Sequence, residues 1–286
     1  EVAVKLFRDG TVDEERTRRQ SDEVRILAGM AHHALVTLFD AGTDLSDPTR
    51  RLSYLVMELV RGQDLRRRSA EGPLSAAHMA LIGHDLADGL AHIHHHGIIH
   101  RDIKPANILL VDYSVEDRRA RAKLSDFGVA ITIREGHHGD PDDSSGTPAY
   151  LSPEQAAGEP AGPASDVYSL GLVLLEGLTG KMAYPGAPVQ SALARLLHDP
   201  DIPEDIAPLW AALLPSMLDR DPAARPPARE VSLALRQEVI NGTGRRRRDP
   251  AALLTDEEGR MQAVGRYGIL DTPADGAFDR IAALAA

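Results

Sequence analysis

Two short stretches of this sequence hold an unusual concentration of polar groups. Residues 100–107 read His-Arg-Asp-Ile-Lys-Pro-Ala-Asn, and residues 126–128 read Asp-Phe-Gly. The first stretch is expected to form a loop. A carboxylate (Asp102), a cation (Lys104) and an amide (Asn107) would then lie together in that loop, which is typical of a site with a chemical function.

The three polar groups match the needs of phosphoryl transfer to an alcohol. That reaction requires a carboxylate that accepts the hydroxyl proton, a cation that neutralises the developing charge and an amide ligand for magnesium. Asp102, Lys104 and Asn107 provide these groups in that order. Asp126 follows a predicted short strand, and its carboxylate is expected to hold the same ion. Alone, Asp-Phe-Gly would indicate only a turn with a packed phenylalanine, so its position downstream of the loop is what favours the metal role.

Together the two motifs resemble the catalytic loop and the magnesium-binding loop of protein kinases. The resemblance extends from Glu1 to about Ile240, with the landmarks in the same order. The sequence is most similar to the Hanks-type, eukaryotic-like serine/threonine kinases of bacteria. This implies an α+β, bilobal kinase fold, with a small β-rich N-lobe over residues 1–60 and a large helical C-lobe over residues 61–240.

The same resemblance implies an enzyme that uses ATP and Mg²⁺ in bacterial signal transduction, with seryl and threonyl hydroxyls of proteins as acceptors. Lys104 and Thr147 resemble the serine/threonine branch, since tyrosine kinases carry a different loop and docking segment. One alternative is a pseudokinase or scaffold that binds partners without turnover, and the retained motif residues speak against it. Another is a small-molecule phosphotransferase, which the peptide-docking segment at residues 146–154 disfavours.

The resemblance also assigns a nucleotide site in the N-lobe. Lys5, in Val-Ala-Val-Lys, is similar to the strand lysine that binds the phosphates of ATP. Glu23 is the helix carboxylate expected to pair with it, and Glu14 and Glu15 are alternatives with poorer spacing. Residues 54–60 resemble the strand that enters the hinge between the lobes. The adenine would contact Met57 at the back of its pocket, backbone groups of Glu58 and Val60, and the side chains of Ala3 and Leu109, the last two being ordinary core residues as well.

Several residues are expected to support the site without touching substrate. Glu154 would form a buried ion pair with Arg225, and Asp166 would brace the backbone of the catalytic loop from the start of a helix. Residues 152–154 read Ser-Pro-Glu where many family members have Ala-Pro-Glu, a departure we expect to be harmless. The resemblance gives structural roles to four more residues, His100, Arg101, Phe127 and Gly128.

The activation segment contains hydroxyls that could regulate the enzyme. Arg101, beside the proposed catalytic aspartate, is a natural partner for a phosphorylated residue. The available hydroxyls are those of Ser144, Ser145, Thr147 and Thr132. We expect phosphorylation at Ser144 or Ser145 to raise activity.

Hydrophobic periodicity predicts mainly strands before residue 60 and mainly helices after residue 75. Ser75 is a plausible N-cap of a helix that ends at Gly97. One apolar face of this helix would contain Met79, Ile82, Leu86, Leu90 and Ile93. The other predicted helices cover residues 13–30, 165–179, 189–198, 206–218 and 228–240, and the predicted strands lie within residues 2–7, 35–41, 52–59, 98–111 and 122–125.

Composition narrows the remaining possibilities. The 286 residues carry a net charge of −11 and no cysteine, which disfavours nucleic-acid binding and excludes thiolate metal sites and disulfides. No apolar run approaches the roughly 20 residues of a membrane span, and we expect a cytoplasmic protein. Histidines at 92, 94, 95, 96, 137 and 138 suggest a metal site. The three consecutive ones point in different directions on a helix, however, and no matching carboxylate cluster accompanies the group, so a metal site there is disfavoured.

Both ends of the sequence suggest a larger protein. The chain starts inside a predicted strand without an initiator methionine, which suggests a fragment. The resemblance to protein kinases implies two further strands and a glycine-rich ATP-binding loop upstream, so we expect weak or absent activity for residues 1–286 alone. Residues 241–254, with the basic run Arg245–Arg248, would form a solvated linker. Residues 255–286 resemble the beginning of a GAF sensory domain, through Ile-Leu-Asp-Thr-Pro at 269–273, with a small-molecule ligand implied; the alternative is an amphipathic tail helix.

Overall fold

A computed structural model describes residues 1–8, 31–47, 50–111, 121–126 and 148–246. The chain divides into two units, residues 1–239 and 240–286, and the fold below is that of the first. The predicted helix at residues 13–30 lies outside the described residues, and so does the predicted GAF-like segment.

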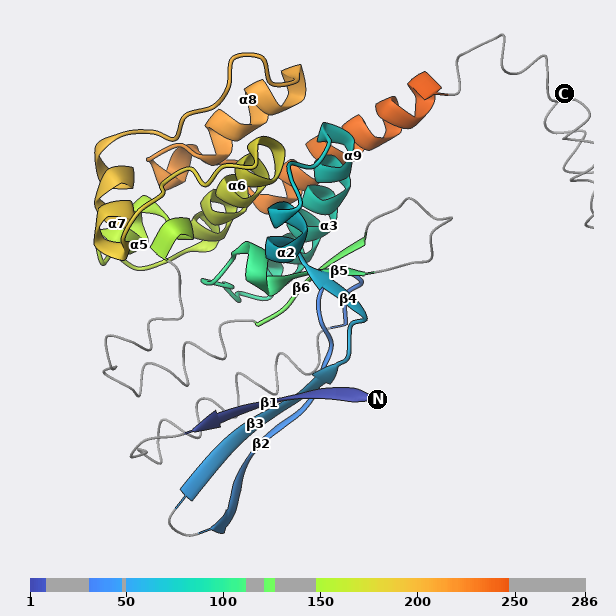
Figure 1. Cartoon of the computed structure of the whole chain (residues 1–286), viewed down its shortest axis with the longest axis vertical. Coiled ribbons are helices and arrows are strands. Elements are labelled where there is room, and N and C mark those ends of the chain that lie inside the picture. The colour runs from blue at the N-terminus through green and yellow to red at the C-terminus, as the bar shows by residue number, and fades with distance from the viewer. Residues whose placement is uncertain (9–30, 48–49, 112–120, 127–147, 247–286) are drawn as a thin grey trace, which may run out of the picture. The chain divides into compact units, whose positions relative to one another are not determined.

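The N-terminal part is a three-stranded antiparallel sheet. Its order is β1 (Val2–Arg8), β3 (Arg50–Glu58) and β2 (Leu38–Asp47), with β3 in the middle (Figure 1). The period of two along β1 gives its faces different environments. Val2, Val4 and Leu6 are 50–59% exposed, whereas Ala3 and Lys5 are partly buried. Lys5 therefore lies on the less exposed face of the sheet, as the alternating pattern predicts.

A second, smaller antiparallel sheet follows in the order β4 (Gly62–Asp64), β5 (Ile108–Val111) and β6 (Arg121–Leu124). The segment before β2 joins this sheet through a parallel bridge between Leu35 and Leu124. Val36 N donates to Leu124 O at 3.0 Å, and Leu124 N donates to Ala34 O at 2.8 Å. Backbone hydrogen bonds thus tie the entrance of the first sheet to β6.

Periodicity predicted a strand within residues 98–111, and this is confirmed only for Ile108–Val111. Residues 100–107 contain no strand, in agreement with the loop expected from the motif. Residues 98–104 are apolar enough to suggest one, but His100 N and Arg101 N donate to the side chain of Asp166 instead of to a neighbouring strand. A short 3-10 turn, Pro105–Asn107, follows. The strand β2 also starts later than predicted, at Leu38, and reaches Asp47.

Helices form the rest of the unit. They are α2 (Leu65–Ala70), α3 (Ala76–His95), α5 (Pro153–Ala156), α6 (Pro163–Thr179), α7 (Pro188–Leu197), α8 (Pro208–Met217) and α9 (Ala228–Arg246). The predicted N-cap is present, since the hydroxyl of Ser75 accepts from His78 N at 3.3 Å. The helix α9 runs to Arg246, past the predicted end at Ile240. No helix among the described residues is long and apolar enough to cross a membrane.

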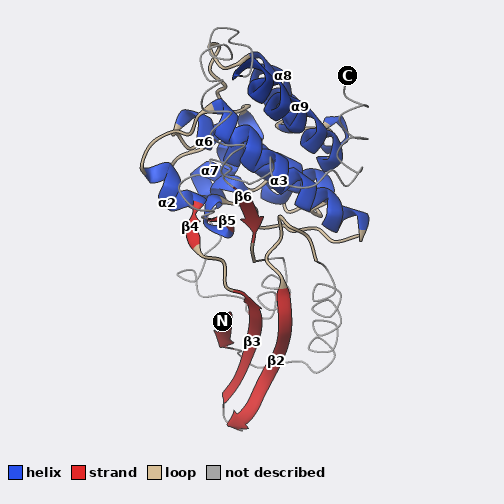
Figure 2. Cartoon of the chain, turned by 90° about the vertical axis from the view of Figure 1, so that its right-hand side faces the viewer, coloured by secondary structure: helices blue, strands red, loops and turns tan. Residues whose placement is uncertain are grey.

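The hydrophobic core lies mainly between α3 and α6, which are adjacent among the helices (Figure 2). All five residues of the predicted apolar face of α3 are at most 1% exposed. Glycine allows the two helices to approach closely, because a Cβ at Gly177 would lie 2.5 Å from Sδ of Met79 and one at Gly83 would lie 2.9 Å from Leu174. This packing fixes the end of α3 beside the start of α6, where the candidate site is anchored.

Candidate active site

The catalytic loop brings together the three polar residues that the sequence singled out. Nζ of Lys104 lies 3.0 Å and 2.8 Å from the two carboxylate oxygens of Asp102. The amide nitrogen of Asn107 donates to Oδ2 of Asp102 at 2.9 Å and to its backbone oxygen at 2.8 Å. Asp102 is therefore held from two sides by a cation and an amide.

Asp166, in the first turn of α6, anchors this loop as predicted. Its Oδ2 accepts from His100 N and its Oδ1 from Arg101 N, both at 2.8 Å. The ring of His94 contacts Oδ2 of Asp166 at 2.8 Å. Since Asp166 is only 1% exposed, these charge-assisted hydrogen bonds lie in a dry environment where they are strong.

His100 links the loop to the segment that ends at Asp126. Its Nδ1 accepts from Asp102 N at 3.3 Å, and its Nε2 donates to Ser125 O at 3.1 Å. Burial lowers the pKa of His100 and outweighs the opposing effect of Asp166, so the ring is neutral with its proton on Nε2. The neutral ring thus connects the backbone of Asp102 to that of Ser125.

Two residues that flank these contacts have left-handed backbone conformations. Arg101 has φ of 67° and Asp126 has φ of 61°. Such conformations cost on the order of 1–3 kcal/mol for residues other than glycine and concentrate at functional sites. Here the hydrogen bonds to Asp166 offset the strain at Arg101.

Lys5 and Asp126 form a direct ion pair, although 121 positions separate them in the sequence. Nζ of Lys5 lies 2.6 Å from Oδ1 of Asp126, and the two side chains are 38% and 26% exposed. The sequence assigned Lys5 to Glu23, which lies outside the described residues, as do Phe127 and Gly128. The predicted phosphate-binding cation and the predicted metal ligand are therefore in one place.

The residues present fit a divalent cation. A carboxylate and an amide oxygen are hard ligands of the kind that Mg²⁺ prefers. Because the amide nitrogen of Asn107 faces Asp102, its carbonyl oxygen lies on the other side of the amide group. Ser125, next to Asp126, donates from its backbone and its hydroxyl to Asn107 O at 2.8 Å and 3.0 Å. Asn107 and Asp126 would hold the ion from two segments that are bonded to each other.

The predicted adenine contacts lie on the two sheets. Ala3 pairs with Met57 between β1 and β3, whereas Leu109 lies on β5; all three are partly buried. Glu58 N already donates to Thr37 O at 2.9 Å. The predicted hydrogen bond between the backbone of Glu58 and the adenine would therefore involve the carbonyl group of Glu58. Val60, at the end of the hinge, is also partly buried.

The predicted ion pair between Glu154 and Arg225 is present and buried. Arg225 donates through Nη1 and Nη2 to the two carboxylate oxygens at 2.8 Å and 2.9 Å, and its side chain is 0% exposed. The hydroxyl of Ser165 donates to Glu154 at 2.6 Å. Burial would raise the pKa of Glu154, but the hydrogen bonds from Arg225 and Ser165 outweigh it and lower this pKa to about 2.

Sequence reasoning missed two partners of these groups. His94 was considered only as part of a histidine run, although its position in the last turn of α3 places it beside the loop. Lys123 was not considered, yet its Nζ lies 2.8 Å from Oε2 of Glu58 and joins β6 to the hinge. The predicted phosphorylation sites Ser144, Ser145 and Thr147 lie outside the described residues.

Comparisons with known proteins agree with this geometry. A family model described as protein kinase domain matches residues 1–234. The chain is 34% identical over 267 residues to the serine/threonine-protein kinase PknB of Mycolicibacterium smegmatis, covering 90% of this chain and 41% of that protein. It is 33% identical over 228 residues to PknA of Mycobacterium tuberculosis, covering 78% and 52%. With PrkC of Bacillus subtilis it shares 34% identity over 221 residues, covering 77% and 32%.

The chain thus spans about half or less of the length of these relatives. The family model nevertheless covers most of the chain, including both the strand of Lys5 and the loop of Asp102. This chain belongs to the protein kinase family.

Proposed function

We propose that the chain is the catalytic part of a serine/threonine protein kinase, which transfers the γ-phosphoryl group of ATP to seryl and threonyl hydroxyls of proteins. The observation that carries the proposal is the loop in which Lys104 and Asn107 both bind the carboxylate of Asp102. The relatives, which are named serine/threonine-protein kinases, support the same reaction. They give no support to a pseudokinase.

In the proposed reaction Asp102 orients the acceptor alcohol and takes its proton. A carboxylate has about four acceptor positions, so Asp102 can bind Lys104 and Asn107 and still accept from a hydroxyl. Lys104, held 2.8 Å from Asp102, places its charge where the transferring group becomes more negative. When bound, ATP supplies the phosphoryl group and a divalent cation, for which we propose Mg²⁺, neutralises its phosphates.

The other side of the site would bind the nucleotide. The ammonium of Lys5 is a cation suited to phosphate oxygens, and Asn107 and Asp126 would hold the ion. The carbonyl of Glu58 and the backbone of Val60 would bind the purine edge, between Ala3 and Leu109. The ion pair of Lys5 with Asp126 supports this reading, because it places both groups at the same point.

The test is phosphoryl transfer by the full-length protein from γ-labelled ATP to a mixture of protein substrates, followed by phosphoamino-acid analysis. We expect phosphoserine and phosphothreonine, and a loss on the order of 100-fold or more in the Asp102→Asn variant, because general base catalysis contributes about that much. Asp201→Asn, which changes an exposed carboxylate, is the matched control. Equal rates in the Asp102→Asn variant, or labelling of tyrosine, would contradict the proposal.

Two finer proposals rest on the sequence alone. Phosphorylation at Ser144 or Ser145 would activate the enzyme through Arg101, and alanine at both positions with undiminished turnover would count against this. Residues 255–286 would begin a GAF-like domain with a small-molecule ligand. The predicted linker at residues 241–254 would be shorter than expected, because residues 241–246 belong to α9.

A further inference from the structure

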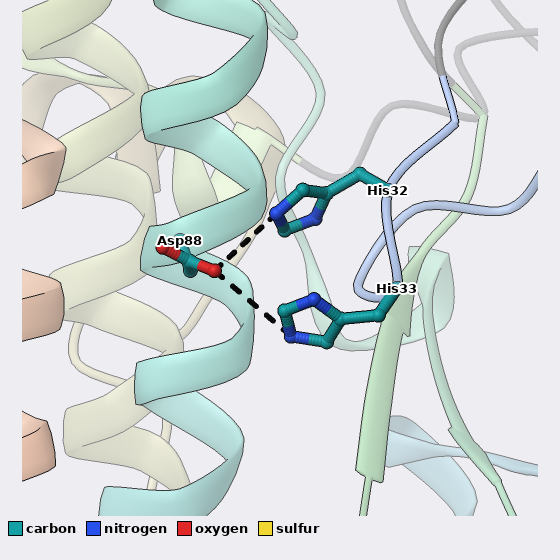
Figure 3. Close-up of side chains that lie close together, drawn as sticks. All are labelled: His32, His33 and Asp88. Atoms are coloured by element: carbon teal, nitrogen blue, oxygen red, sulfur yellow. Dashed lines mark ion pairs between the residues drawn. The ribbon is translucent and has the colours of Figure 1, made fainter.

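Two histidines and an aspartate from distant parts of the chain point toward one another outside the candidate active site. His32 and His33 precede β2, and Asp88 lies on α3 (Figure 3). Oδ2 of Asp88 is 3.3 Å from Nε2 of His32 and 4.0 Å from Nε2 of His33. One ligand atom from each of the three residues can be chosen so that all lie within 4.8 Å of one another.

These distances are close to those of a metal site. Zinc binds imidazole nitrogen at about 2.0–2.1 Å in a tetrahedron, which separates neighbouring ligand atoms by about 3.3 Å. One pair already has this separation, and the 4.0 Å pair needs a movement of less than 1 Å. The side chains of His33 and Asp88 are 46% and 42% exposed, so both have room to move.

The surroundings of the three residues favour a metal over a simple ion pair. Asp88 and His92 are spaced by four residues on one face of α3, a spacing suited to shared metal binding. The ring of His92 stacks on that of His32, with ring centroids 5.0 Å apart, and His96 lies 4.8 Å from His92.

The nearby carboxylate of Asp85 has a different role. It lies 3.5 Å from His33, but it is buried and accepts from Arg121 and from Ala122 N at 3.2 Å each. These contacts hold the second sheet against α3. Asp88, which is more exposed, is the better third ligand.

We propose that His32, His33 and Asp88 form a binding site for a divalent transition metal of the Zn²⁺ class, with a fourth position for water or His92. Two imidazoles and one carboxylate are a ligand set that zinc uses when one position stays open. The ion would connect the segment before β2 to α3. None of its ligands is one of the predicted Mg²⁺ ligands, Asn107 and Asp126.

Coordination through Nε2 of His32 would cost one hydrogen bond. Ala34 N donates to Nδ1 of His32 at 3.2 Å, which places the ring proton on Nε2. Binding has to move that proton to Nδ1 and release the contact with Ala34. We therefore expect weaker binding than in structural zinc sites, whose ligands donate their second ring nitrogen to an acceptor.

The test uses the 286-residue chain without a histidine tag, titrated with ZnCl₂ by calorimetry. We expect one equivalent to bind and the thermal unfolding midpoint to rise with Zn²⁺, because a ligand of the native state stabilises it. The double variant His33→Gln/Asp88→Asn should bind more than tenfold more weakly, since losing residues that merely position a ligand already costs about 10–100-fold. His78→Gln/Asp201→Asn, which removes the same two chemical groups from exposed positions, should bind normally.

The proposal is overturned if the unmodified chain shows no saturable binding, or if the double variant retains the affinity of the control. A second measurement does not depend on any variant. Co²⁺ bound to the unmodified chain should give the visible absorption bands of a four- or five-coordinate nitrogen and oxygen site. The weak bands of an octahedral ion would contradict the predicted geometry.

Discussion

The loop that carries Asp102 and the strand that carries Lys5 contribute to the same candidate site, but they are held by different kinds of contact. The loop is held by buried polar groups: His100 is 0%, Asp166 1% and Asn107 4% exposed. Their hydrogen bonds connect the loop with α6 and with Ser125, which directly follows β6. Its geometry is thus set before any substrate arrives.

The strand β1 is held more loosely. Its outer residues, including Val4 and Leu6, are more than half exposed, and most of the buried core belongs to the helices. Near the site, two ion pairs join the first sheet to β6 and the residues that follow it. They are Lys123–Glu58 and Lys5–Asp126, whose side chains are 14–38% exposed. Partly exposed ion pairs contribute little stability.

This difference indicates which part of the reaction the loop and the first sheet each control. A pre-organised loop lowers the barrier of the chemical step, because its groups need no rearrangement in the transition state. A sheet held by a few polar contacts can adjust to the nucleotide. Changes on the loop side should therefore lower stability and kcat, and changes on the sheet side should raise KM for ATP.

The largest expected effect is on the buried framework of the loop side. Arg225→Leu leaves Glu154 charged and without its partner, which should lower the free energy of unfolding by about 3–5 kcal/mol. Urea unfolding at pH 7 measures this loss. Arg229→Leu, at an exposed position on α9, is the control and should change stability by no more than about 0.5 kcal/mol. If Arg225→Leu lost less than about 1 kcal/mol, the size of an ordinary substitution, the framework would not be what fixes this side.

Acid should weaken the same pair in a defined direction. The pKa of Glu154 is lowered from 4.5 to about 2, so the stability that its charge provides is complete above pH 4.5 and is lost as the pH falls toward 2. In Arg225→Leu, the carboxylate of Glu154 stays buried without the arginine beside it, so its pKa should rise. Protonating Glu154 then removes the free-energy cost of a buried, unpaired charge. The stability difference between the two proteins should therefore shrink between about pH 5 and pH 2. A constant difference would mean that Glu154 does not titrate as inferred.

The next effect is on the loop itself. Asp166→Asn replaces an acceptor of two backbone N–H groups with a side chain that presents an N–H of its own. We expect kcat to fall by about 100-fold, because a displacement of about 1 Å in a catalytic group costs that much. KM for ATP should change little, since Asp166 accepts from the backbone of His100 and Arg101 in the loop and contacts the ring of His94. A variant that folds normally and raises KM with unchanged kcat would reverse the proposed division between the two sides.

Local sequence patterns predicted the loop side well. The apolar face of α3 and its N-cap at Ser75 follow from spacing, and both are present in the structure. The contacts of Asp166 and Glu154 were expected from the resemblance to protein kinases, which supplied partners that lie far apart in the sequence, and these contacts are present as well. The error at residues 98–104 has the opposite origin, because a side chain from α6 takes the hydrogen bonds that a strand would have used.

Contacts between the two sides were not predictable in this way. Lys5 meets Asp126, and His32 meets Asp88, across long stretches of sequence with no periodic signal. Histidines were judged only within their own run, so the carboxylate of Asp88 and the imidazoles before β2 were not connected. Such pairs become visible only when the fold is known.

The smallest expected effect is on the sheet side. Lys123 donates to Glu58 at 2.8 Å and to Leu35 O at 3.3 Å, and thereby fixes the hinge against β6. Burial would raise the pKa of Glu58, but the hydrogen bonds from Lys123 and from Thr37 N lower it, which indicates that the carboxylate depends on these donors. Lys123→Met should raise KM for ATP about fivefold, or about 1 kcal/mol, with kcat nearly unchanged.

Arg121 provides the matched control, because it lies on the same strand but pairs with Asp85 of α3 instead of with the hinge. Arg121→Met should leave KM for ATP unchanged. Steady-state kinetics at varied ATP concentration compare the two variants directly. If both variants raise KM equally, β6 affects ATP binding through its general stability. If only Lys123→Met raises KM, the Lys123–Glu58 ion pair positions the hinge. The affinity for ATP can then be changed without disturbing the loop that holds Asp102.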